Sequence, residues 1–136
     1  MMKIEFNFEQ SAVIPYRKKN ENTEVLLITS LRKKKWIVPK GYIEFNLTAF
    51  ESAKKEAYEE AGVLGQNETE ELGYLEVKKK VGLWHMKVYK MEVTELLDEY
   101  PEKEMRKRKW FPVNEAAEKV SIPGMKELIL KLNHSN

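Results

Sequence analysis

Short apolar runs with a strand-like pattern open the chain. Residues 11–16 and 23–29 form two such runs, separated by a polar and charged turn, as in a β-hairpin. Residues 36–38 form a third run, which ends at Pro39 and Gly41 because proline and glycine interrupt strands. The pattern therefore predicts three strands, followed by a loop that turns at Gly41.

A helical period replaces this pattern between residues 49 and 61. Four apolar residues recur three and four positions apart: Phe50, Ala53, Ala57 and Ala61. This spacing places them on one face of a helix. Thr48 is a good N-cap residue, Glu51 completes a capping box, and Gly62 suits the position just past the end of a helix. We therefore predict a helix over residues 49–61.

The second half of the chain returns to strands. Residues 65–71 are polar and predicted to be a loop, while residues 72–80 and 83–93 are predicted to pair as antiparallel strands around a break at Val81 and Gly82. Residues 96–108 are too highly charged to bury, which predicts a loop or short turn.

The last part of the chain combines one strand with two helices. Residues 110–113 are predicted to form a strand, and Asn114 to cap a short helix that ends at Val120. A closing helix is predicted over residues 125–132, with Leu128, Leu130 and Leu132 partly buried. This order of elements indicates an α/β (α+β) fold with a mixed sheet covered by helices. The chain has neither internal repeats nor a long linker, so we expect one domain over residues 1–136.

Composition narrows the class of protein. The 136 residues are 42% hydrophobic and 34% charged, as in soluble globular domains. The sequence has no apolar run long enough to cross a bilayer and no signal-peptide pattern. Because it contains no cysteine, disulfides, thiolate nucleophiles and cysteine-bound zinc are excluded. We expect a cytoplasmic protein, monomeric or homodimeric, with no membrane partner.

Basic residues are clustered although the net charge is only +2. Four runs stand beside predicted turns, at residues 17–19, 32–35, 78–80 and 106–109. Such runs are often solvated turns, but their recurrence favours a surface that attracts polyanions. Nucleic acid is a possible but less favoured ligand, because no aromatic-rich binding motif accompanies the runs.

Three carboxylates share one stripe of the predicted helix 49–61. Glu56, Glu59 and Glu60 are one, three and four positions apart, so their side chains converge beside the apolar stripe. The same spacing is common on solvated helix faces, but a capped helix after a turn favours an ion site. Oxygen ligands suit Mg²⁺ or Mn²⁺, which share their coordination with substrate phosphates.

Residues 41–63 resemble the Nudix box, whose pattern is G-x5-E-x7-R-E-U-x-E-E-x-G-U, where U is aliphatic. The glycines at 41 and 62 and the three helix carboxylates match without an insertion, and Val63 supplies the closing aliphatic residue. The segments WIVPKG at residues 36–41 and KWFPV at 109–113 resemble other strands of the same family. The resemblance therefore covers most of the chain.

This resemblance implies a Nudix α/β/α sandwich with a mixed central sheet, and metal-dependent hydrolysis of a phosphoanhydride by water. It implies Mg²⁺ or Mn²⁺ bound by Glu56, Glu59, Glu60, the backbone carbonyl of Lys40 and one loop carboxylate, taken here as Glu102 with Glu104 as the alternative. One of the helix carboxylates, with Glu59 and Glu60 as the catalytic candidates, or the loop glutamate would accept the proton. Four cations are candidate substrate-binding residues: Lys40, Arg32, Lys34 and Arg17.

Two positions depart from the family pattern. In relatives the first glutamate and the arginine of the box can pair, whereas here Leu47 and Lys55 replace both. Because both members changed together, we interpret this as a compensated substitution. It excludes any mechanism in which the first glutamate of the box is the general base.

Substrate choice depends on the loops around the box. Residues 26–41 resemble the subgroup that hydrolyses diphosphoinositol polyphosphates and dinucleoside polyphosphates. The alternatives are a nucleotide-sugar or nucleoside-triphosphate pyrophosphatase, and a non-catalytic sensor or RNA-binding module. Trp36, Trp84 and Trp110 are expected in the core or on a sheet face.

Overall fold

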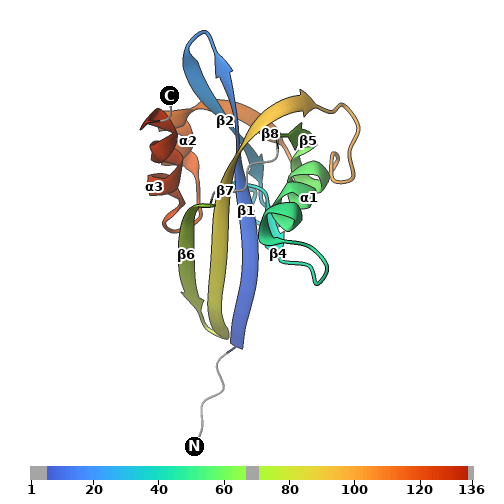
Figure 1. The fold of residues 1–136 in the computed structure, drawn as a ribbon, viewed down its shortest axis with the longest axis vertical. Helices are drawn as coiled ribbons and strands as arrows, with labels where there is room; N and C mark the ends of the chain where they lie inside the picture. The colour runs from blue at the N-terminus through green and yellow to red at the C-terminus, as the bar shows by residue number, and fades with distance from the viewer. Residues whose placement is uncertain (1–5, 67–70, 135–136) are drawn as a thin grey trace, which may run out of the picture.

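One mixed eight-stranded sheet forms the centre of the molecule (Figure 1). The structure, a computed structural model, describes residues 6–66 and 71–134. The strands are β1 (Phe6–Lys19), β2 (Asn22–Thr29), β3 (Trp36–Ile37), β4 (Lys40–Tyr42), β5 (Val63–Gly65), β6 (Glu71–Lys79), β7 (Gly82–Leu96) and β8 (Arg108–Pro112). β1 and β7 run parallel, and every other pairing between the described strands is antiparallel. The predicted mixed sheet is confirmed.

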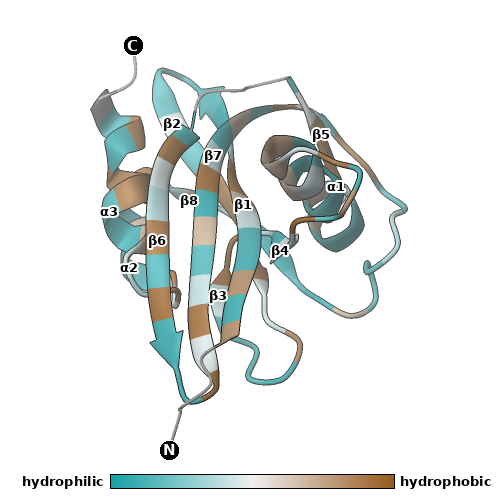
Figure 2. Ribbon diagram, turned by 60° about the horizontal axis from the view of Figure 1, so that its bottom comes forward, coloured by the Kyte–Doolittle hydropathy of each residue, from teal (hydrophilic) through white to brown (hydrophobic). Residues whose placement is uncertain are grey.

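Helices cover both faces of this sheet (Figure 1). The helix α1 (Ala49–Ala61) packs on one face, while α2 (Val113–Lys119), α3 (Met125–Leu130) and the short 3-10 helix η1 (Lys131–His134) lie on the other. Hydrophobic and hydrophilic residues alternate along β6, β7 and β1 (Figure 2). This alternation supplies two separate hydrophobic clusters, one beneath α1 and one beneath α2 and α3.

Local sequence sets both ends of α1. The Thr48 hydroxyl accepts a hydrogen bond from the Glu51 N–H at 3.0 Å, and the Glu51 carboxylate accepts one from the Thr48 N–H at 2.9 Å. Gly62 ends the helix with φ of 66°, a left-handed conformation that glycine adopts without strain. The predicted bounds, capping box and buried apolar stripe of this helix are all confirmed.

Two short strands were not predicted. Gly41 does not turn the chain but lies in β4, paired with Ser11 of β1. The expected loop 65–71 is preceded by β5, which pairs with the end of β7; residues 67–70 lie outside the described part of the chain. Both strands have three residues and owe their structure to distant partners, so local periodicity gives no sign of them.

Helix ends near the C-terminus also differ from expectation. α2 begins at Val113 directly after β8, so Pro112 takes the N-cap position and the prediction for Asn114 is wrong. The Asn114 side chain instead accepts a hydrogen bond from Asn133 at 2.8 Å. The closing helix ends at Leu130 and continues as η1. No helix in the described ranges is long and apolar enough to cross a membrane.

Candidate metal and phosphate site

Two carboxyl groups on successive turns of α1 form the centre of the site. Glu60 is only 6% exposed and accepts a hydrogen bond from the Lys40 N–H of β4 at 3.3 Å. Glu56 lies against Gly41, where an added Cβ would collide with the Glu56 carboxylate. The short strand β4 therefore holds both side chains, and glycine at position 41 makes room for one of them.

Burial makes both carboxyl groups resist ionisation. Burial, with a smaller contribution from the Glu56 charge, raises the pKa of Glu60 to about 8, although Arg106 acts in the opposite direction. Burial also raises the pKa of Glu56, and the two side chains hydrogen-bond to each other. A buried and a half-buried carboxyl group that hydrogen-bond to each other are a fitting place for a cation, which can replace the proton between them.

The other predicted metal ligands do not complete a metal-binding group with Glu56 and Glu60. Within residues 6–66 and 71–134, no group of three or more His, Cys, Asp or Glu side chains is arranged to hold a metal ion. Glu59 lies beside the pair on α1 and is half-buried. The Glu56–Glu60 pair thus offers a partial set of oxygen ligands, which suits an ion that keeps several waters.

Arg106 connects the pair to the loop carboxylate. Its Nε donates to Glu102 Oε1 at 2.9 Å, its Nη2 lies 3.8 Å from Glu60 Oε2, and its Nη1 donates to the Thr29 carbonyl at 3.1 Å. The Glu102 N–H also donates to the Glu59 carbonyl at 2.9 Å. Glu102 therefore lies next to the end of α1 that carries Glu59 and Glu60, where it is bound to a guanidinium.

The burial of Arg106 corrects one expectation. Its side chain is 8% exposed, although the segment 96–108 was predicted to be too charged to bury. Arg106 is not among the site residues predicted from sequence, where it belongs only to the basic run 106–109. Glu102 four positions earlier is the one local signal of its role, since residues four apart can pair in a helical turn.

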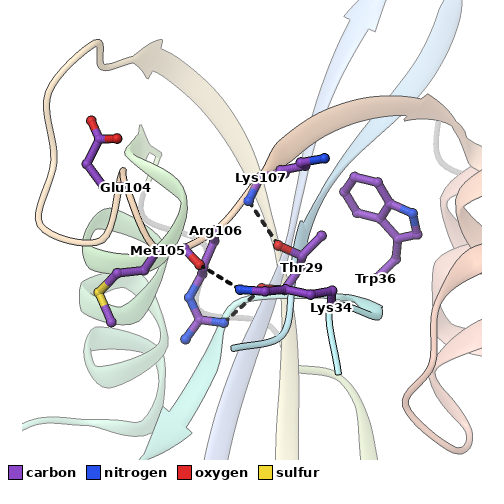
Figure 3. A pocket seen from close by; sticks show the side chains of 7 residues that line it. All are labelled: Thr29, Lys34, Trp36, Glu104, Met105, Arg106 and Lys107. Atoms are coloured by element: carbon purple, nitrogen blue, oxygen red, sulfur yellow. Dashed lines mark hydrogen bonds between the residues drawn. The ribbon is translucent and has the colours of Figure 1, made fainter. Parts of the chain in front are cut away.

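Two cavities with basic walls meet at Arg106. One, of about 440 Å³, is lined by Glu60, by Lys40 of β4 and by three cations of the loop before β3: Arg32, Lys33 and Lys35. The other, of about 460 Å³, contains Lys34, Trp36 and Lys107. Figure 3 shows the Lys34 side chain reaching toward Met105, where it donates to the Met105 carbonyl at 3.5 Å, and the Arg106 guanidinium donating to the Thr29 carbonyl. Basic side chains therefore line both the cavity that contains Glu60 and the cavity next to it.

The four candidate substrate cations occupy different surroundings. Arg32 and Lys40 line the cavity that holds Glu60, and Lys34 lines the adjoining one. Burial lowers the pKa of Lys40. Arg17 lines neither of these two cavities; its guanidinium pairs with Glu24 at 2.8 Å and lies 4.1 Å from the centre of the Trp110 ring.

Lys55 has a carboxylate partner from the loop before α1. Its ammonium lies 2.9 Å from Glu44 Oε2, and that interaction raises the pKa of Lys55. Leu47 is three positions further along the same loop, where its N–H donates to the Glu44 carbonyl at 3.1 Å. The pairing between loop and helix that Leu47 cannot make is therefore made by Glu44.

Comparisons with known proteins agree with this architecture. The family model "NUDIX domain" matches residues 9–132. The chain is 37% identical over 124 residues to Nudix hydrolase 21, chloroplastic, of Arabidopsis thaliana, covering 85% of this chain and 61% of the relative. It is 36% identical over 111 residues to diphosphoinositol polyphosphate phosphohydrolase 2 of Rattus norvegicus, covering 79% and 60%.

Solved structures share the fold at lower sequence identity. A crystal structure of the Caenorhabditis elegans Ap4A hydrolase superimposes with a TM-score of 0.76 and 20% identity, covering 95% of this chain and 98% of that one. A NUDIX hydrolase from Nitrosomonas europaea gives 0.76 and 14%, covering 96% and 90%. The chain spans about 60% of the length of the two curated relatives described above.

Proposed function

The chain belongs to the NUDIX domain family, and from that premise we propose that it is a metal-dependent pyrophosphohydrolase that cleaves phosphoanhydride bonds. The observation that carries the proposal is the Glu56–Glu60 pair of α1, in which the buried Glu60 lies at the wall of a cavity with basic residues. Such a hydrolysis requires two parts: carboxylates that hold a divalent metal ion, and basic side chains that hold the substrate phosphates.

Each group has a distinct part in this proposal. Glu56, Glu60 and the Lys40 carbonyl would hold Mg²⁺ or Mn²⁺, which supplies charge neutralisation and water activation when bound. Arg32 and Lys40 would bind the phosphates, with Lys34 beside them. Arg106 orients Glu60 and Glu102 through the contacts already described.

We assign proton acceptance to Glu59. Both oxygens of Glu60 face cationic or N–H groups, since Oε1 accepts from the Lys40 N–H and Oε2 faces Arg106. Glu102 accepts from Arg106 in the same way. Glu59 is adjacent to Glu60 and Glu102, and it is more exposed than Glu60. It is therefore the carboxylate best suited to take a proton from the attacking water.

A substrate with several phosphates fits the site best. The rat relative's name describes a diphosphoinositol polyphosphate phosphohydrolase, and the two adjoining cavities can engage more phosphates than a nucleotide sugar offers. We therefore favour diphosphoinositol or dinucleoside polyphosphates over nucleotide sugars and nucleoside triphosphates. We keep the cytoplasm as the proposed location; fractionation of cells tests it.

Two observations favour a second candidate, a non-catalytic ligand sensor. Arg106 already places a positive charge 3.8 Å from Glu60, and the three expected helix ligands are not arranged as a group that could hold metal in the described residues. A sensor of this kind would bind phosphorylated ligands without metal and without turnover.

A substrate panel separates the two candidates. Release of phosphate or pyrophosphate is measured from dinucleoside tetraphosphate, diphosphoinositol pentakisphosphate, ADP-ribose and ATP, with Mg²⁺ and with chelator, and the products are identified. We expect Mg²⁺-dependent release that is lost in Glu59→Gln and retained in Glu115→Gln, a substitution on the exposed side of α2. Ligand binding without any metal-dependent release would support the sensor instead.

A further inference from the structure

Ser11 of β1 carries a buried hydroxyl group without a partner. Its side chain is 0% exposed, and within residues 6–66 and 71–134 its Oγ makes no hydrogen bond. A buried hydroxyl that is left unpaired destabilises a fold, so buried polar groups are nearly always paired and an exception needs a reason. Packing alone gives no reason for serine in place of alanine at this position.

The direction of the Ser11 side chain follows from its place in the sheet. Val13, two residues further along β1, belongs to the hydrophobic cluster beneath α1. β1 pairs with β7 in an unbroken register over these residues, and alternate residues of a strand point to the same face. Ser11 therefore points to the side of the sheet on which α1 packs.

The Glu56 carboxylate of α1 lies on that same side, one strand away from Ser11. Ser11 pairs directly with Gly41 of β4, and residues paired in this way project to one face with Cβ positions about 4.5–5.5 Å apart. A Cβ added to Gly41 would collide with Glu56 Oε2. The strand pairing thus brings the unpaired hydroxyl close to one member of the carboxyl pair.

The two members of the carboxyl pair differ in their other partners. Glu60 accepts a hydrogen bond from the Lys40 N–H and faces Arg106. The partner that the structure gives to the Glu56 carboxylate is Glu60 itself. Carboxylates that bind a metal ion are in turn oriented by hydrogen bonds from neighbouring groups. Glu56 is therefore the ligand for which a further donor matters more.

We propose that Ser11 is a positioning residue, whose hydroxyl donates a hydrogen bond to the Glu56 carboxylate when that carboxylate binds the divalent cation. Rotation about χ1 carries the Oγ atom between staggered positions, so the hydroxyl can turn toward Glu56 without movement of the strand. This assignment rests on the proposed function and adds a residue that lies outside the Nudix box. In the alternative explanation, serine serves only as a small side chain that leaves room for Glu56.

Ser11→Ala separates these explanations, because it keeps a small side chain and removes only the hydroxyl. In chelator, we expect its unfolding midpoint to equal or exceed that of the wild type, since an unpaired buried group is removed. Its Kd for Mn²⁺, measured by electron paramagnetic resonance, should rise about tenfold. Its turnover should recover as Mn²⁺ is raised, because Ser11 acts through a metal ligand.

Ser52→Ala provides the matched control. Ser52 of α1 is also 0% exposed, but its hydroxyl accepts a hydrogen bond from the Glu44 N–H at 2.9 Å. Ser52→Ala should therefore lower the unfolding midpoint in chelator and keep the Kd for Mn²⁺ close to that of the wild type. The two variants are expected to differ in both measurements.

Three results would overturn the assignment of Ser11. The first is a wild-type Kd for Mn²⁺ in Ser11→Ala. The second is an equal rise of this Kd in both variants, which would indicate a general disturbance of α1. The third is a lower unfolding midpoint of Ser11→Ala in chelator, or its failure to fold, because the hydroxyl would then already stabilise the metal-free protein.

Failure of this assignment can be told apart from failure of the proposed function. If the wild type binds Mn²⁺ and hydrolyses a phosphoanhydride, but Ser11→Ala binds Mn²⁺ equally well, only the role of Ser11 is wrong. A wild type that binds no Mn²⁺ would overturn both.

Discussion

Glu60 shows how far one residue's surroundings control the chemistry of this site. Its carboxyl group is buried against Glu56, and its pKa rises from 4.5 to about 8. A carboxyl group with a higher pKa in the folded state than in the unfolded state contributes to the stability of the fold while it is protonated. This contribution is fully present at any pH below the pKa of the unfolded state. That contribution is lost as the pH rises through the folded pKa.

The thermal stability of the metal-free protein should therefore fall with pH. In chelator, we expect the unfolding midpoint to decrease between pH values of about 5 and 8.5. Mg²⁺ should reduce the decrease, because it replaces the proton, and Glu60→Gln should flatten it. Calorimetric scans across this range provide the measurement. A midpoint that rises with pH in the wild type, or the same slope in Glu60→Gln, would contradict the assigned burial.

Lys55 and Glu44 make the contact that the substitution at position 47 removed. Both side chains are nearly half exposed, at 45% and 42%, and exposed ion pairs contribute little to stability. Lys55→Ala should therefore leave the unfolding midpoint and turnover almost unchanged. If the substitution at position 47 is compensated, Leu47→Glu should not raise turnover much. A gain in turnover of about 10²-fold in Leu47→Glu, typical of an added general base, would show instead that the natural site lacks a general base.

At the scale of elements, α1 carries the carboxylates and its N-terminal cap fixes its first turn. Thr48→Ala removes the hydroxyl acceptor for the Glu51 N–H and should lower the free energy of unfolding by about 1 kcal/mol. Thr48→Ser keeps an acceptor and should lower it much less. Denaturant titration of both variants measures the difference. If both variants lose the same free energy of unfolding, the loss would come from the Thr48 methyl group and not from the capping hydrogen bond.

Elements whose signals are local were predictable, and those fixed by distant partners were not. Thr48, Glu51 and Gly62 define α1 within fourteen positions of one another, so its bounds follow from sequence. β5 depends on β7 some thirty residues away. Arg106 illustrates the same limit at the site, since its burial depends on Thr29 and Glu60, which no local pattern connects to it.

At the scale of the whole molecule, three of the four basic runs can be compared by their surroundings. Run 32–35 lines the two cavities beside the carboxyl pair. In run 106–109, Arg106 is buried and Arg108 donates to the Ala61 carbonyl at the end of α1 at 2.9 Å. Run 17–19 lies at the tip of the β1–β2 hairpin, with Arg17 paired to Glu24. Among these three, run 32–35 is the one with most residues at the two cavities, so we expect it to bind substrate phosphates.

Replacing Lys33, Lys34 and Lys35 with glutamine should raise KM for a dinucleoside polyphosphate more than it lowers kcat. The effect should shrink as salt rises, because exposed charges are screened beyond about 8 Å at physiological ionic strength. The matched control replaces Lys119, Lys126 and Lys131 of the C-terminal helices, which removes the same charge. Steady-state kinetics that change equally in both triple variants would indicate a general effect of net charge.

The central claim is that Glu56 and Glu60 hold the divalent cation on which hydrolysis depends. Mn²⁺ binding followed by electron paramagnetic resonance, with turnover measured on the same samples, tests it most directly. We expect Glu60→Gln to lose Mn²⁺ binding and to lower turnover by about 10²-fold or more, and Glu115→Gln to match the wild type. Mn²⁺ binding by Glu60→Gln at wild-type affinity, or wild-type turnover without bound metal, would contradict it.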